Sequence, residues 1–365
     1  MKCLWNRFFR AVVIVGFLIF AEHEVRATPF TQGDLAIYQA DASANNSTFS
    51  IVEINTTTAN QTAVQTISIN GTTTPNELRT SGTASSNGLL ALSADRSLLA
   101  FTGHNSTTTS ANANTLNPRG VGTLDANGNY NLATTYTGTS GNQTRGATTL
   151  DNSNWFISDQ GGIYTNGSIG ASPSGNTRGI KAFGGTVYAL QQSATAAVIA
   201  SVSATSGGTL TAVSGLPANN NATDFYMLSS ANNGTYDELY VASGTGNGTG
   251  ISKFSLVSGT WTANGTAAVT GGVYGIAAAL DPLGGEDLYV TTGNGGANNS
   301  VLKFVDSAGF NSSITVGTPT TLFTAPSGAI DKGIEFVPIP VPEPAALVLA
   351  LVGLAAMGPR LRRPA

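Results

Sequence analysis

The chain is poor in cysteine, histidine and charge, and each scarcity excludes a kind of chemistry. Its one cysteine, Cys3, precedes the first apolar run, so the body has no disulfide, thiolate metal site or cysteine nucleophile. Of the two histidines, only His104 lies outside the N-terminal segment, which excludes a multi-histidine metal site. His104 stands in a loop-like stretch, Gly103–Ser110, with no nucleophile motif beside it, so no catalytic triad is expected.

Charged residues make up only 10% of the chain, against about 25% in a typical soluble domain. Seven of the 16 basic residues and three of the 20 acidic ones lie in the two ends, which leaves 9 basic and 17 acidic residues, a net charge of −8, for the body. No basic stripe is available to neutralise phosphates, so nucleic-acid binding is not expected. Gly, Thr, Asn and Ser replace the missing charges and indicate long neutral polar loops on a β scaffold.

The N-terminus has the three-part layout of a secretory signal peptide. Lys2, Arg7 and Arg10 precede an apolar run, Ala11–Ala21, and Val25-Arg26-Ala27 then offers small residues around a cleavage point. This layout predicts export by the Sec pathway with cleavage after Ala27. A permanent membrane anchor is the weaker interpretation, because the run is about half the roughly 20 residues needed to span a bilayer.

The C-terminus carries a second address signal. A Pro-Glu-Pro motif is followed by an apolar run, Ala345–Met357, and then by a basic tail; the residues of the motif and tail are Pro342, Glu343, Pro344, Arg360, Arg362 and Arg363. Arginines after an apolar segment stay on the cytoplasmic side of a membrane. A short buried helix that ends the domain is the alternative, but it would leave three arginines beside the core.

This C-terminal arrangement resembles the PEP-CTERM sorting signal over about the last 25 residues. The resemblance implies a Gram-negative-type bacterium, processing by an exosortase-type membrane protease, transient inner-membrane anchoring through the apolar segment, and delivery to the cell surface or exopolysaccharide matrix. Thirteen apolar residues are a marginal span, which suits a transient anchor.

Between the two ends, the sequence repeats. An aromatic residue stands among aliphatic and β-branched residues in the second strand expected for each unit, at Tyr38, Phe101, Phe156, Tyr188, Tyr240 and Tyr289. The average spacing is about 50 residues, close to the 40–50 residues of a four-stranded propeller blade. Each unit reads as four short strands separated by Gly/Asn/Ser turns, although the third has only a weak fourth strand.

The first unit lacks one strand, and a spare strand follows the last unit. Gly333–Pro338 reads as the start of a further unit, and the first unit begins with Asp34–Gln39. The pattern therefore predicts an all-β, six-bladed propeller closed by a C-terminal strand; a seven-bladed propeller, a β-helix and a stacked sandwich are the alternatives. The chain divides into a signal peptide (1–27), a β-propeller domain (28–340) and a sorting segment (341–365).

Three cations precede expected inner strands and are candidate ligand-binding residues at the channel mouth. Arg145, Arg178 and Lys332 could attract an anionic group such as a uronic acid or sulfate of a polysaccharide, with Asp159 beside them. The sequence favours the alternative, in which they join neighbouring blades through loop carbonyls and carboxylates such as Asp159 or Asp331.

No metal or cofactor site stands out, although calcium is possible. The stretch Asp125–Asn129 has oxygens at alternate positions but lacks the bidentate Glu of an EF-hand, and Asn127-Gly128 suits a tight hairpin. Five carboxylates could contribute to an axial calcium, although no spacing singles them out: Asp151, Asp159, Asp224, Asp281 and Glu335.

Two functions from different classes follow. The first is an exported surface or matrix protein without enzymatic activity, which acts as a structural, adhesive or exopolysaccharide-binding propeller. The second is a secreted propeller hydrolase or lyase acting on a sugar or lactone with an axial calcium. An enzyme should bring several carboxylates to the channel, some with a pKa raised by burial, whereas a structural module should fill its channel with apolar or small side chains. The few charges and the near absence of histidine favour the first function.

Overall fold

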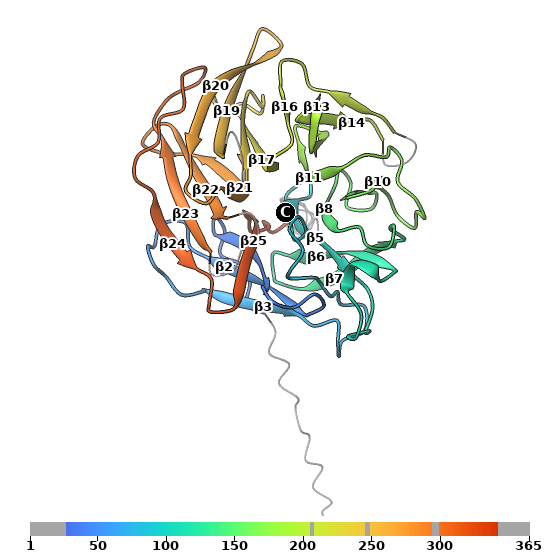
Figure 1. Cartoon of the computed structure of the whole chain (residues 1–365). Helices are drawn as coiled ribbons and strands as arrows, with labels where there is room; N and C mark the ends of the chain where they lie inside the picture. The colour runs from blue at the N-terminus through green and yellow to red at the C-terminus, as the bar shows by residue number, and fades with distance from the viewer. Residues whose placement is uncertain (1–26, 205–207, 245–248, 294–298, 342–365) are drawn as a thin grey trace, which may run out of the picture.

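The computed structural model describes residues 27–204, 208–244, 249–293 and 299–341, and all but two of their strands form six sheets around one axis (Figure 1). The predictions for 1–26 and 342–365, the signal peptide and the sorting segment, lie outside the described residues. Among the described residues, no helix is long and apolar enough to cross a membrane.

Each sheet is one blade, whose strands follow one another from the axis outward. Blade 1 contains β25 (Ala329–Phe336), β1 (Leu35–Asp41), β2 (Phe49–Ile54) and β3 (Gln65–Ile69). Blade 2 contains β4 (Ala91–Leu92), β5 (Leu98–His104), β6 (Arg119–Asp125) and β7 (Tyr130–Tyr136). Blade 3 contains β8 (Thr144–Thr149), β9 (Trp155–Asp159) and β10 (Gly162–Tyr164). Blade 4 contains β11 (Thr177–Phe183), β12 (Thr186–Gln191), β14 (Ile199–Val202) and β15 (Leu210–Ala212). Blade 5 contains β17 (Ala222–Leu228), β18 (Glu238–Ser243), β19 (Gly250–Val257) and β20 (Thr260–Ala268). Blade 6 contains β21 (Val273–Leu280), β22 (Glu286–Thr292), β23 (Ser300–Asp306) and β24 (Thr320–Thr324).

The ring closes through the last strand, as the sequence predicts. β25 pairs antiparallel with β1, from Leu35 opposite Phe336 to Asp41 opposite Ala329. The C-terminal strand therefore becomes the inner strand of the blade that the N-terminal strands begin (Figure 1). Every strand of the described residues lies within residues 27–341, so this segment contains a complete closed ring.

The repeated aromatic residues mark the second strand of every blade. Five of the six are buried, and the set is Tyr38 in β1, Phe101 in β5, Phe156 in β9, Tyr188 in β12, Tyr240 in β18 and Tyr289 in β22. Because both faces of a blade pack against neighbouring blades, most residues of these strands are buried; β18 is buried along its whole length, whereas three of the six residues of β12 are half-buried. The aromatic spacing was therefore a correct guide to blade count.

One local prediction about the strands was wrong, and one pair of strands was not predicted. Blade 3 has three strands in the described residues, because the stretch after β10 is rich in Gly and contains Pro173, which lacks the N–H donor that a strand needs. That stretch hydrogen-bonds to β10 irregularly, through Ile163 N to Pro173 O and Ser172 N to Ile163 O. Between blades 4 and 5, β13 (Ser193–Ala197) and β16 (Ala218–Asn219) form an additional pair that the sequence pattern did not indicate.

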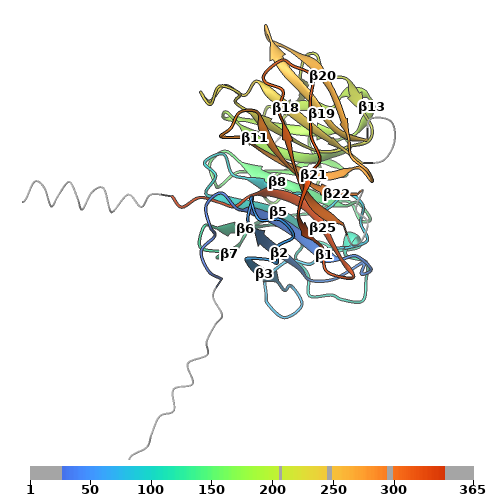
Figure 2. The same ribbon diagram turned by 90° about the vertical axis from the view of Figure 1, so that its left-hand side faces the viewer.

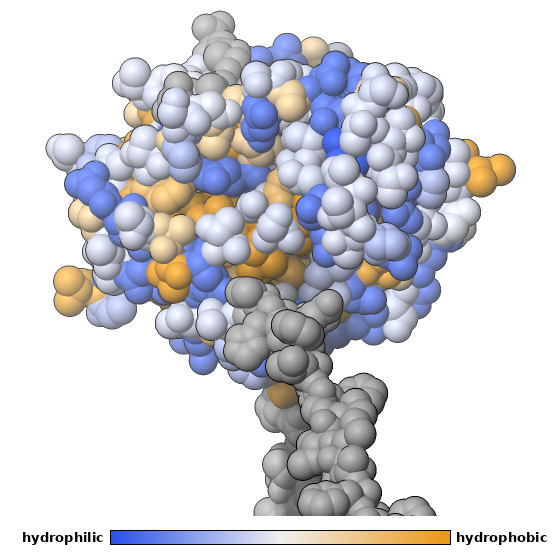
Figure 3. All heavy atoms as spheres, turned by 90° about the horizontal axis from the view of Figure 1, so that it is seen from below, coloured by the Kyte–Doolittle hydropathy of each residue, from blue (hydrophilic) through white to orange (hydrophobic). Residues whose placement is uncertain are grey.

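The two ends of the channel differ. The inner strands all run in the same direction along the axis, so their first residues lie at one end and their last residues at the other (Figures 1 and 2). The segment after β25 lies at the second end, where Ile339 N donates to Arg96 O. On the outer side seen in Figure 3, hydrophobic residues gather near the middle of a mostly hydrophilic surface. The exposed large apolar residues come from several blades and include Val64, Leu150, Ile169, Leu283 and Phe310.

Candidate functional site

A β-bulge occurs near the start of five inner strands. In each, the pairing with the second strand of the blade shifts register around one or two residues. A bulge leaves a residue outside the ladder and re-aims its side chain. The residues at this position, which with Asn87 before β4 we call the axial ring, are Lys332 in β25, Arg145 in β8, Arg178 in β11, Thr223 in β17 and Tyr274 in β21.

In four of these blades glycine follows the ring residue, and at Gly333 and Gly275 the neighbouring inner strand approaches very closely. A Cβ on Gly333 would meet the carbonyl of Gly88 and lie 2.7 Å from Leu90 N. A Cβ on Gly275 would lie 2.9 Å from Lys332 O. Close packing of inner strands therefore accounts for Gly333 and Gly275, whereas a Cβ on Gly146 would lie 3.6 Å from its nearest neighbour.

Lys332 and Tyr274 of the axial ring meet at Asn87. The Lys332 ammonium donates to Asn87 Oδ1 and to Ala84 O, and the Tyr274 hydroxyl donates to Asn87 O at 2.6 Å. The ammonium also lies 5.9 Å from the Tyr274 ring centroid. Burial lowers the pKa of Lys332 to about 7, because no carboxylate within the described residues forms an ion pair with it.

The two arginines of the axial ring differ in their partners. Arg145 Nη1 donates to Asn176 Oδ1 at 2.7 Å and to Thr177 O, which joins blade 3 to blade 4. Arg178 makes no hydrogen bond or ion pair with any described residue, and its Nε is buried. Burial lowers the pKa of both, and the charge of Arg178 adds to the effect on Arg145, whose pKa falls to about 9. The axial ring thus gathers three cations without a paired carboxylate.

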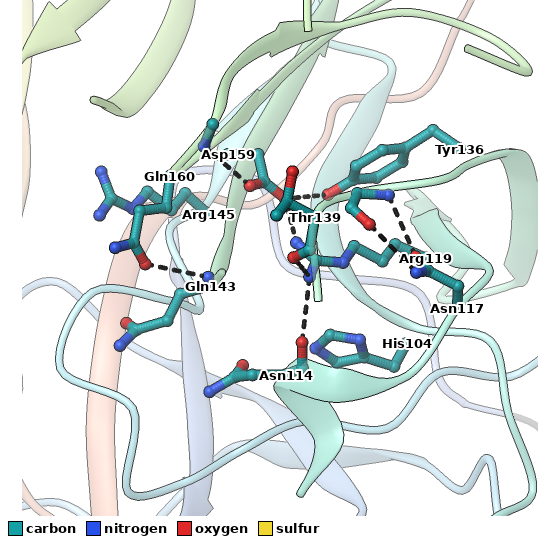
Figure 4. A network of polar contacts seen from close by, with 12 residues as sticks. His104, Asn114, Asn117, Arg119, Tyr136, Thr139, Gln143, Arg145, Asp159 and Gln160 are labelled. Atoms are coloured by element: carbon teal, nitrogen blue, oxygen red, sulfur yellow. Dashed lines mark hydrogen bonds and ion pairs between the residues drawn. The ribbon is translucent and has the colours of Figure 1, made fainter. Parts of the chain in front are cut away.

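Asp159, which the sequence placed with these cations, has another partner. Its Oδ2 accepts from Arg119 Nη1 at 2.5 Å and from the Tyr136 hydroxyl at 2.9 Å, and all three residues are buried. Figure 4 shows the carboxylate directed toward Arg119 and Tyr136, while the Arg145 guanidinium extends the other way. Asp159 therefore joins blade 3 to blade 2.

Arg119 was not found by sequence reasoning. It precedes a glycine, like Arg145 and Arg178, but it lies in β6, the third strand of blade 2. Its Nη2 also donates to the carbonyls of Asn114 and Thr139.

His104 is fully buried at the end of β5, not in a loop as predicted, and its Nδ1 lies 3.2 Å from Leu116 O. Burial and the Arg119 charge lower the pKa of His104 to about 3, so the imidazole of His104 is neutral.

At the other end of the channel, the last residues of the inner strands surround a cavity of 490 Å³, which we call the axial cavity. Its polar floor contains Lys181, whose ammonium lies 2.8 Å from Glu335 Oε2 and 3.5 Å from Asp224 Oδ2. Asp224 also accepts from Ile276 N. Burial raises the pKa of Asp224 to about 6, although Lys181 opposes the shift. Glu335 therefore lines the cavity, Asp224 lies buried behind it, and the Lys181 ammonium joins the two carboxylates.

The other carboxylates considered for calcium lie in hairpins. Asp151 accepts from the backbone of Ser153 and Asn154, and Asp281 from Leu283 N. Asp125 Oδ1 accepts from Asn127 N and Asn129 N, which makes the Asp125–Asn129 stretch a hairpin turn. No group of three or more His, Cys, Asp or Glu side chains within the described residues is arranged to hold a metal.

Comparison with known proteins gives likenesses of fold only. No family model matches the chain, and no curated protein matches its sequence. One similar solved structure is TolB from Acinetobacter baumannii, with 10% identity and a TM-score of 0.44 over 87% of this chain and 69% of that one. Another is a putative 6-phosphogluconolactonase from Bacteroides uniformis, with 12% identity and a TM-score of 0.44 over 84% of this chain and 100% of that one. The periplasmic gluconolactonase PpgL of Pseudomonas aeruginosa is similar to the same degree, with 12% identity and a TM-score of 0.45 over 84% of this chain and 100% of that one. With TM-scores below 0.5, these likenesses assign no activity.

Proposed function

We propose that this chain is an exported β-propeller that binds anionic polysaccharide at the axial ring and has no enzymatic activity. The single observation that supports this most is Arg178, a partly buried arginine whose Nε is buried and which has no partner among the described residues, beside the buried Arg145 and in the same axial ring as the buried Lys332. Removing a charge from water is costly unless it is paired. A carboxylate-bearing ligand would supply the missing negative charge.

The chemistry of the axial ring suits a uronate. A planar guanidinium can bind a carboxylate through two parallel hydrogen bonds. Arg145 Nη1 already donates to the neighbouring blade, whereas neither Nη of Arg178 donates to a described residue. Lys332, which is fully buried, would add to the positive potential at the site without contacting the ligand. Sugar acids of an exopolysaccharide present a carboxylate beside several hydroxyls, so they match this set of groups.

The two terminal signals supply the proposed location. A signal peptide cleaved after Ala27 and a PEP-CTERM-like segment over 341–365 support export, transient anchoring and exosortase-dependent delivery to the surface or matrix of a Gram-negative-type bacterium. Antibody detection of the body in membrane, surface and medium fractions, with and without residues 341–365, tests this location. Retention of both forms inside the cell would contradict it.

Binding is tested on residues 28–341, which contain the whole closed ring. Oligogalacturonate is titrated calorimetrically into the wild type, Arg178→Gln and the matched variant Arg96→Gln, an exposed arginine at the other end of the channel. We expect Arg178→Gln to weaken binding about tenfold, or ~1.4 kcal/mol, Arg96→Gln to bind like the wild type, and a neutral galactan oligomer not to bind at the axial ring. Equal binding by wild type and Arg178→Gln would refute the proposal.

Asp224 and Glu335 favour a hydrolase or lyase as the second candidate. Both lie on inner strands and contact Lys181, Glu335 lines the axial cavity, and the pKa of Asp224 is raised into the range useful for acid–base catalysis. Turnover of sugar lactones and uronate oligomers by the wild type, its loss in Asp224→Asn, and its response to calcium and EDTA would support this candidate over the first.

A further inference from the structure

The axial cavity is independent of the axial ring. Lys181 stands three residues after Arg178 on β11, and Glu335 three residues after Lys332 on β25, so about 10 Å of strand separates the two levels. The cavity volume of 490 Å³ falls within the roughly 300–1,000 Å³ of small-molecule sites. From its shape, walls and charge balance we infer that the axial cavity is a second ligand site, which takes a neutral sugar unit such as a disaccharide.

The walls of the axial cavity are aromatic. Phe183 lies in the middle of the group, with its ring centroid 5.3 Å from those of Tyr226 and Tyr236. Phe336 continues the surface, 6.3 Å from Tyr226. All four line the cavity. Aromatic rings with one polar end suit ligands that are apolar on one face and polar at the edge, and the C–H face and hydroxyl rim of a pyranose have that character.

The floor of the cavity supplies hydrogen-bonding groups. Glu335 Oε2 accepts from Lys181, and Oε1 accepts from Phe336 N. An ionised carboxylate offers about four acceptor positions, so Glu335 retains capacity for hydroxyl donors. The Tyr226 hydroxyl lies beside Glu335 and adds a group that can donate or accept. Vicinal sugar hydroxyls both donate and accept, and therefore use both kinds of group.

The charge balance selects a neutral ligand. Lys181, Arg96 and Glu335 line the cavity, and the fully buried Asp224 lies behind Lys181, so two cations at the cavity are balanced by one lining carboxylate and one buried carboxylate. A charged ligand would gain attraction from one pair and meet repulsion from the other. The axial ring, with three cations and no paired carboxylate, has the opposite preference. The two ends of one channel would thus separate neutral from acidic sugar units.

The test uses residues 28–341 and three probes: cellobiose, maltose and digalacturonate. Saturation-transfer NMR and calorimetry are applied to the wild type, Tyr226→Phe, Tyr236→Ala and, as the control at the axial ring, Arg178→Gln. We expect at least one neutral disaccharide to bind, Tyr236→Ala to weaken it about tenfold, Tyr226→Phe to weaken it by a smaller factor, and Arg178→Gln to leave it unchanged.

Three outcomes would overturn the inference. They are no binding of either neutral disaccharide at millimolar concentration, unchanged affinity in both tyrosine variants, and competition between digalacturonate and the neutral sugar for the cavity. Circular dichroism shows whether each variant is folded, and Tyr226→Phe removes only a hydroxyl, so it is the decisive variant if Tyr236→Ala unfolds. Loss of digalacturonate binding in Arg178→Gln with unchanged disaccharide binding separates this inference from the proposed function.

Discussion

Lys332 and Tyr274 occupy equivalent positions on neighbouring inner strands, β25 and β21, and both hydrogen-bond to Asn87 of the next blade. Three blades therefore meet at one asparagine: the last blade, the blade closed by the C-terminal strand, and blade 2. The same contact places an ammonium without an acidic partner beside the channel. Closure of the ring and the charge of the axial ring thus depend on the same residues.

Binding of a uronate to the axial ring should take up protons. The pKa of Lys332 lies near 7 because the ammonium is buried, and a bound carboxylate would raise it. At pH 7.5 a fraction of Lys332 is neutral and would gain a proton as the ligand binds. Calorimetry in two buffers with different ionisation enthalpies measures this uptake. Lys332→Met should abolish it; an unchanged proton uptake in this variant would show that another group is responsible.

Glu286 should make the fold less stable as the pH rises. Lys253 lies within 3.6 Å of three carboxylates, those of Glu238, Glu286 and Asp306. Burial, and then the hydrogen bond and charge of Glu238, raise the pKa of Glu286 to about 8 from 4.5. Between these values the unfolded chain releases a proton that the folded chain keeps, so the free energy of unfolding falls as the pH rises from about 4.5 to 8.

The test of this pH effect is Glu286→Gln, which keeps an amide donor toward Glu238 but does not titrate. Urea unfolding measures how much the free energy of unfolding falls between pH 5 and pH 8. In Glu286→Gln this fall should be smaller than in the wild type by on the order of 2 kcal/mol. Glu77→Gln, in the loop before β4, is the control and should decline like the wild type. A Glu286→Gln decline equal to that of the wild type would mean that Glu286 is ionised in the fold.

Loss of the Asp159 carboxylate should destabilise the junction of blades 2 and 3. Asp159→Asn leaves Arg119 buried without its counter-charge, which costs about 3–5 kcal/mol. Tyr136→Phe removes only one hydrogen bond to the same carboxylate and should cost about 1 kcal/mol. Chemical unfolding of both variants gives the comparison. Equal costs for the two would contradict a dominant role for the ion pair.

Gly333→Ala should weaken the closure of the ring. The new methyl group would lie 2.7 Å from Leu90 N and 2.8 Å from Leu89 Cα of blade 2, and backbone atoms cannot move aside as a side chain can. Overpacking of this kind costs about 1–3 kcal/mol. Gly309→Ala is the matched control, because no atom lies within 4 Å of its added methyl group. Thermal unfolding that ranks the two variants in the reverse order would disprove this account of the inner glycines.

The features that repeat could be predicted from the sequence, and the features that depend on pairing over long distances could not. Aromatic residues in the second strands and glycines at the inner bulges recur because every blade meets the same packing demands, so Tyr289 and Gly333 were informative without any structure. The spare strand at Gly333–Pro338 indicated closure for the same reason.

Arg119 and Asp159 are 40 residues apart and share no repeat position, so nothing local indicated their ion pair. The convergence of Asp224 and Glu335 on Lys181 also depends on which blades become neighbours after closure. Sequence reasoning placed Arg145, Arg178 and Lys332 near one end of the channel; it could not separate Arg178, without a described partner, from Arg145, which binds the next blade.

The closing strand β25 is also the last strand before the chain leaves the domain. Six residue pairs join it to β1, and the segment after it crosses the channel mouth at Ile339. A pull on the chain beyond Val341 would act along β25, so that its hydrogen bonds to β1 would carry the load together in shear and would not open one after another. A propeller held by its C-terminus would in this way resist mechanical extraction through the strand that completes its ring.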